Sequence, residues 1–132
     1  ALGAPSRIPP GPQVRVGDDL FSIEIADTPE ERTRGLSGHA PLAEDEGMFF
    51  IFEQADRYGF WMKEMLFPID IIWIKGESVI GIAEDLPLAE SASPSLYYPP
   101  TSVDRVLEVR AGEARARGIA AGDEVEFIMP SQ

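Results

Sequence analysis

Short apolar runs broken by turn residues are the feature that most constrains the fold of this chain. Several of them alternate apolar and polar side chains, as Leu20 to Ala26 and Val103 to Arg110 do. A period of two is typical of half-buried strands. The runs are separated by glycine, proline and aspartate, with no regular alternation of strand and helix patterns along the chain. The pattern therefore predicts a sheet that is mostly antiparallel.

The other predicted strands are at 48–52, 60–64, 69–74, 78–83 and 124–129, and 13–16 is expected to be a short extended piece. A short helix is predicted after Thr28, because Thr28 and Glu31 have capping-box spacing and Pro29 suits the first helical position. Gly35 is expected to end it. A second short helix is predicted at 112–118. The predicted fold class is mainly β (β-rich α+β), an antiparallel sandwich or flattened barrel decorated by two short helices.

The domain organisation predicted from composition is simple. Residues 1–12 are rich in proline and read as a disordered leader, and residues 13–132 read as a single β-rich domain. The leader resembles a tether that follows a removed signal peptide, so we expect a periplasmic or secreted protein, with a cytoplasmic one as the alternative. No apolar run approaches the roughly 20 residues that cross a bilayer.

Charge and composition exclude several classes of function. The net charge of −12 repels phosphate backbones, so nucleic acid is a poor partner. The chain has no cysteine and a single histidine, His39, which leaves no cysteine-based or histidine-cluster metal site. No P-loop, dinucleotide fingerprint or nucleophile elbow is present. We therefore expect no metal and no cofactor, and the sequence does not indicate an oligomeric state.

The segment 60–74 places two charges, Lys63 and Asp70, in a densely apolar and aromatic stretch. Burying a charge is costly unless it is paired. Lys63, Arg34 and Arg105 are the candidate partners of Asp70, and Arg105 too shares a strand face with apolar side chains. Three interpretations stay open at this point: an ion pair that fixes strand register, a ligand or catalytic role, or a position at a strand end in water.

The predicted ligand-binding residues are Trp61, Lys63, Asp70, Arg105 and Arg34. Trp61 could stack against a ligand beside the Lys63 ammonium, although Lys63 could equally lie over a core tryptophan. Arg34 could instead complement the dipole of the first helix.

Two functional hypotheses follow from these residues. The first is a small exported, non-catalytic binding or interaction domain for a small polar ligand or a protein partner. Its groove would lie near Trp61, Lys63 and Asp70, under the Pro/Ser/Tyr-rich loop 84–102. The alternative is an acid–base enzyme of hydrolase type that uses Asp70 with Lys63 and Arg105.

Five ordered strings of residues resemble one known family. They are Thr28 to Leu36, Glu46 to Phe52, Phe60 to Lys63, Pro68 to Ile72, and Val106 to Val109 with Gly112 and Gly118-Ile119. Over about residues 20 to 128 the chain resembles the prokaryotic family called domain of unknown function 192. The resemblance implies a small β-rich domain, with export signals in many members, and it supplies no catalytic assignment. Where the family tends to carry a small polar pair such as Asn-Thr after Trp-Met-Lys, this chain has Glu64-Met65.

Overall fold

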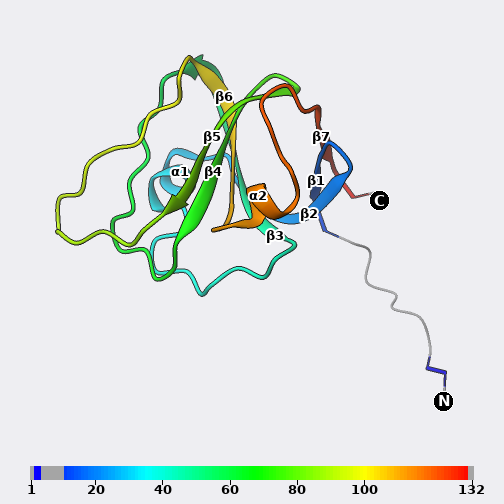
Figure 1. The fold of residues 1–132 in the computed structure, drawn as a ribbon, viewed down its shortest axis with the longest axis horizontal. Coiled ribbons are helices and arrows are strands. Elements are labelled where there is room, and N and C mark those ends of the chain that lie inside the picture. The colour runs from blue at the N-terminus through cyan, green and yellow to red at the C-terminus, as the bar shows by residue number, and fades with distance from the viewer. Residues whose placement is uncertain (1, 4–10, 131–132) are drawn as a thin grey trace.

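The structure, a computed structural model, describes residues 2–3 and 11–130, and within them it has seven strands and two short helices (Figure 1). The strands are β1 (Gln13–Val16), β2 (Asp19–Ala26), β3 (Glu46–Asp56), β4 (Ile69–Lys75), β5 (Ser78–Leu86), β6 (Val103–Arg110) and β7 (Val125–Ile128). The helices are α1 (Pro29–Arg34) and α2 (Glu113–Ala116). Most of the predicted leader, residues 1–12, lies outside the described residues, so it stays a prediction, as does export.

The strands form one sheet in the order β5-β4-β6-β3-β2-β1-β7. Neighbouring strands are antiparallel except β2 and β3, which run parallel because α1 and the loop after it carry the chain back across the sheet. The sheet curls into a half-barrel, with the loop between β5 and β6 on the left of Figure 1 and β7 on the right. The predicted fold class, mainly β with two short helices, is confirmed.

Each face of the sheet carries its own hydrophobic core. Alternation along β4 sends Ile69, Ile71 and Trp73 to one face and Ile72 and Ile74 to the other. We call the first the α1 face, because Leu36 just after α1 and the segment 58–67 pack on it. The second is the α2 face, which α2 and the strands β1 and β7 cover.

The predicted strand at 60–64 is wrong. Phe60 makes one isolated antiparallel bridge, to Tyr97, and the chain then turns. Met62, Met65 and Phe67 are buried at a spacing that no strand has, and between them Glu64 has a positive φ of 61°. The aromatic and apolar composition was misleading because these residues fill the core from a folded-over segment.

The helix α1 is positioned by its ends, since none of its residues is buried. Thr28 and Glu31 form the predicted capping box, with Pro29 in the first turn. The Arg32 guanidinium donates a hydrogen bond to the Ile51 carbonyl of β3 at 3.0 Å. At Gly35, where φ is 50°, a side chain would meet the Phe50 ring at 3.3 Å. This glycine therefore lets the end of α1 approach β3 closely.

Candidate functional site

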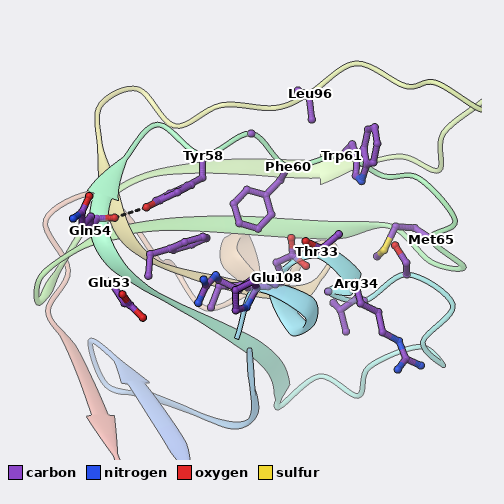
Figure 2. A pocket seen from close by; sticks show the side chains of 18 residues that line it. Thr33, Arg34, Glu53, Gln54, Tyr58, Phe60, Trp61, Met65, Leu96 and Glu108 are labelled. Atoms are coloured by element: carbon purple, nitrogen blue, oxygen red, sulfur yellow. Dashed lines mark hydrogen bonds between the residues drawn. The ribbon is translucent and has the colours of Figure 1, made fainter. Parts of the chain in front are cut away.

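A pocket of about 790 Å³ opens on the α1 face, between α1, β3 and the chain segment that carries Tyr58, Phe60 and Trp61 (Figure 2). Small-molecule sites in proteins commonly have volumes of about 300–1,000 Å³. We call this the aromatic pocket, because five of its lining residues are aromatic. They are Phe50, Phe52, Tyr58, Phe60 and Trp61.

The aromatic walls are held by contacts between the rings. Phe50 and Phe52 point to the same face of β3, as residues two apart in a strand do. Phe52 stacks on Tyr58 with 3.8 Å between ring centroids, and Phe60 meets the Phe50 ring edge-on at 5.1 Å. Phe60 also packs edge-on against the core residue Trp73 at 5.6 Å. This packing makes a preformed apolar wall.

Glu108 is the buried titratable group of the pocket. It lies in β6, between Met48 of β3 and Ile71 of β4, and it is 5% exposed. Burial alone raises the pKa of its carboxyl to about 8, because no hydrogen bond or opposite charge among the described residues offsets the loss of water. At neutral pH the side chain is therefore mainly a neutral carboxylic acid. It can donate one hydrogen bond into the pocket, or it can ionise if a cation arrives.

Three polar residues that line the pocket, Arg32, Thr33 and Arg34, come from α1. The Arg32 guanidinium lies over the Phe52 ring, 5.2 Å from its centroid. Arg34 is exposed, and its side chain extends away from Glu108 in Figure 2. Ser37 donates a hydrogen bond to the Lys63 carbonyl at 2.8 Å, which joins the loop after α1 to the segment that carries Trp61.

Two of the predicted ligand-binding residues, Trp61 and Arg34, line this pocket. Trp61 is 44% exposed, and Lys63 places its Nζ 5.1 Å from the centroid of the Trp61 ring. Lys63 thus lies over a tryptophan as predicted, although this tryptophan is at the surface.

Asp70 is a structural residue on the opposite face of the sheet. Its side chain is fully buried, and one oxygen accepts a hydrogen bond from the Asp85 amide at 2.8 Å. The other oxygen accepts from the Gly112 and Ala114 amides, at 3.1 and 3.0 Å, and so caps the start of α2. The predicted ion pair of Asp70 with Lys63, Arg34 or Arg105 is wrong, because backbone amides satisfy the carboxyl instead.

Arg105 also lies away from the aromatic pocket. It donates a hydrogen bond to the Gly76 carbonyl at 2.9 Å, while its buried Nε has no partner among the described residues. It lines a second hollow of about 510 Å³ beside β7. The predicted groove joining Trp61, Lys63 and Asp70 is therefore not formed, nor is the set of Asp70, Lys63 and Arg105. A ligand contact at any of the five residues stays a prediction.

Sequence reasoning missed Glu108 because β6 also carries Asp104, Arg105 and Arg110, so a carboxyl in this strand did not stand out. Asp70 drew attention because its own strand is apolar on both sides of it as far as Lys75. The prediction for β6 considered the face that Arg105 shares with Leu107 and Val109, whereas Glu108 lies on the other face with Val106.

Residues 2–3 and 11–130 contain neither a metal-binding cluster nor a membrane-spanning helix. Among these residues no group of three His, Asp or Glu side chains is placed to hold a metal ion. None of the helices found there has the length and apolar character needed to cross a membrane.

Fold and pocket together define a small β-rich half-barrel domain with an aromatic pocket on one face. The chain belongs to the DUF192 family, described as Uncharacterized ACR, whose model matches residues 13–127. The resemblance noted from the sequence is thereby confirmed.

Two solved structures are similar to this chain. A protein of unknown function from Novosphingobium aromaticivorans shares 30% sequence identity with a TM-score of 0.80, over 86% of this chain and 83% of that one. A protein described as a proposed transcription regulator from Sinorhizobium meliloti shares 26% identity with a TM-score of 0.79, over 92% of this chain and 98% of that one. No match was found among curated proteins.

Proposed function

We propose that this chain is a non-catalytic binding domain that holds a small molecule in the aromatic pocket. One observation carries the proposal: Glu108, a buried carboxyl without a partner among the described residues, lines a preformed pocket of about 790 Å³. An unpartnered buried polar group destabilises a fold, and an apolar side chain at this position of β6 would avoid that cost. A ligand that hydrogen-bonds to Glu108 would offset this cost and would account for a carboxyl at this position.

Two other functions find less support in the same observations. An acid–base enzyme built on Asp70, Lys63 and Arg105 would need these groups together, whereas backbone amides occupy both oxygens of Asp70. A regulator of transcription, as the Sinorhizobium protein is described, would approach nucleic acid with a net charge of −12.

The experiment is a protein-observed NMR screen with small amines, alcohols and carboxylic acids. Binding should shift the signals of the Trp61 indole, Phe60 and Gly35, which line the pocket. Thr33→Phe should block the shifts, because Thr33 lines the pocket. Glu30→Phe is the matched control, since Glu30 is exposed on the same helix and does not line the pocket.

Two results would defeat the proposal. One is a screen in which no compound shifts the pocket signals. The other is binding that survives Thr33→Phe as well as it survives Glu30→Phe.

A further inference from the structure

We propose that the ligand of the aromatic pocket is an organic cation, an ammonium group carried on a small apolar or aromatic body. The inference rests on the proposed binding function and names the chemical class of its ligand. Three observations carry it: the ring faces of the pocket, the Glu108 carboxyl that has no partner among the described residues, and the charge of the whole chain.

The aromatic walls already attract the protein's own cations. The Arg32 guanidinium lies 5.2 Å from the centroid of Phe52, and the Lys63 ammonium lies 5.1 Å from the centroid of Trp61. Ring faces carry negative charge density, and cations within about 6 Å of a centroid are stabilised by it. Phe50, Phe60 and Tyr58 complete the same wall. An ammonium ligand would be attracted to the rings of the pocket for the same reason.

Glu108 supplies the counter-charge for such a ligand. A cation beside the carboxyl favours its ionised form, so binding releases the proton and leaves a charge-assisted pair. An uncharged ligand would gain one ordinary hydrogen bond there. An anionic ligand would keep the carboxyl protonated and would enter against a net charge of −12.

The other charged residues that line the pocket are Arg32, Arg34 and Glu53. From α1 come Arg32, bound to the Ile51 carbonyl and the Phe52 ring, and Arg34, which extends away (Figure 2). From β3 come Met48 opposite Glu108 and, further along the pocket, the exposed Glu53; β4 places the apolar Ile71 opposite. The Tyr58 hydroxyl donates to the Gln54 carbonyl. Neither arginine neutralises Glu108, since burial is the cause of its raised pKa.

The test is calorimetric titration of the full chain with three probes that share one ring: benzyltrimethylammonium, benzyl alcohol and benzoate. The quaternary cation keeps its charge at every pH, so any pH dependence belongs to the protein. We expect it to bind most tightly of the three. Its affinity should rise about tenfold between pH 7 and pH 9, as the ionised fraction of Glu108 rises.

A second readout needs no variant. At pH 7, binding of the cation should release about one proton, seen as a dependence of the heat on the buffer's ionisation enthalpy. Glu108→Gln should abolish both the proton release and the pH dependence, and it should weaken the cation about tenfold or more. Glu53→Gln removes a carboxylate from the same pocket and should leave the proton release intact.

Each other outcome overturns the inference. Tighter binding of benzyl alcohol or benzoate, blocked by Thr33→Phe, would leave the binding function standing and change the class of its ligand. Cation binding without proton release, or equal binding by Glu108→Gln, would place the cation elsewhere. Failure of all three probes would also overturn it, and the wider compound screen with Thr33→Phe would then decide whether the binding function fails with it.

Discussion

At the scale of single residues, two buried carboxyls have opposite roles. Asp70 accepts hydrogen bonds from three backbone amides and so joins α2 and Asp85 of β5 to β4. Glu108 faces a pocket and has no such partner among the described residues. Asp70 therefore stabilises the fold. Ionisation of Glu108 would destabilise the fold, because the charge would be buried without a partner among the described residues.

Replacing Asp70 with alanine should lower the free energy of unfolding by roughly 3–5 kcal/mol, because three buried amides lose their acceptor. Asp104→Ala is a graded control, since Asp104 accepts one hydrogen bond, from the Gly76 amide at 2.8 Å, and its loss should cost about 1 kcal/mol. Urea unfolding measures both, and hydrogen exchange of the Gly112 and Ala114 amides should quicken in the first variant alone. Equal losses in the two variants would contradict the role given to Asp70.

Replacing Glu108 with glutamine should stabilise the protein at high pH. The folded chain keeps a proton that the unfolded chain releases from the ordinary pKa of 4.5 upward, so stability falls as pH rises towards about 8. The advantage of the variant should therefore grow by roughly 3 kcal/mol between about pH 5 and about pH 8.

Urea melts of both proteins across this pH range measure the effect of Glu108. His39 is a second group whose pKa is raised, mainly by its hydrogen bond with the Ala40 carbonyl and further by its hydrogen bond with Glu24. It is present in both proteins, so the difference between them isolates Glu108. A constant offset at every pH would contradict the buried, unpaired carboxyl.

At the scale of elements, the segment between β3 and β4 shapes the pocket by folding over the sheet. Glu64 makes the turn with a φ of 61°, and its carbonyl accepts a hydrogen bond from the Gly38 amide at 2.9 Å. Asparagine tolerates this backbone region far better than glutamate does. An asparagine at this position, as in the small polar pair expected from the family resemblance, would suit this φ better than Glu64 does.

Glu64→Asn should accordingly raise the free energy of unfolding by about 0.5–1 kcal/mol, since it relieves a left-handed glutamate. Glu90→Asn makes the same exchange at another exposed position, in the loop before β6 and without positive φ, and should change stability little. Chemical denaturation of the two variants compares them. A destabilised Glu64→Asn would show that the side chain of Glu64, and not its backbone, matters.

At the scale of the whole molecule, local patterns predicted the sheet, and contacts between distant segments decided the site. Alternation predicted β6 with its observed bounds and β2 to within one residue, and the capping box predicted the start of α1. Parity within β4 likewise placed Asp70 with Ile72 and Ile74. These predictions succeeded because a few neighbouring residues determine each feature.

The parts that failed depend on the tertiary fold. Whether 60–64 pairs as a strand or folds over the sheet depends on Tyr97 and on the core beneath it. The hydrogen-bond partners of Asp70 are backbone amides of α2 and of Asp85 in β5. Backbone amides carry no formal charge, so looking for opposite charges in the sequence does not find them. The sequence also does not say which face of the sheet α1 covers. The pocket that Glu108 lines could therefore not be predicted from it.

The central claim is that a buried carboxyl, unpaired among the described residues, lines an aromatic pocket. The most direct measurement is the side-chain carboxyl ¹³C shift of Glu108 followed by NMR through a pH titration. The account predicts a midpoint of about 8, far above the ordinary value of 4.5. A midpoint near the ordinary value would mean that water or a cationic side chain reaches Glu108, and it would contradict the account.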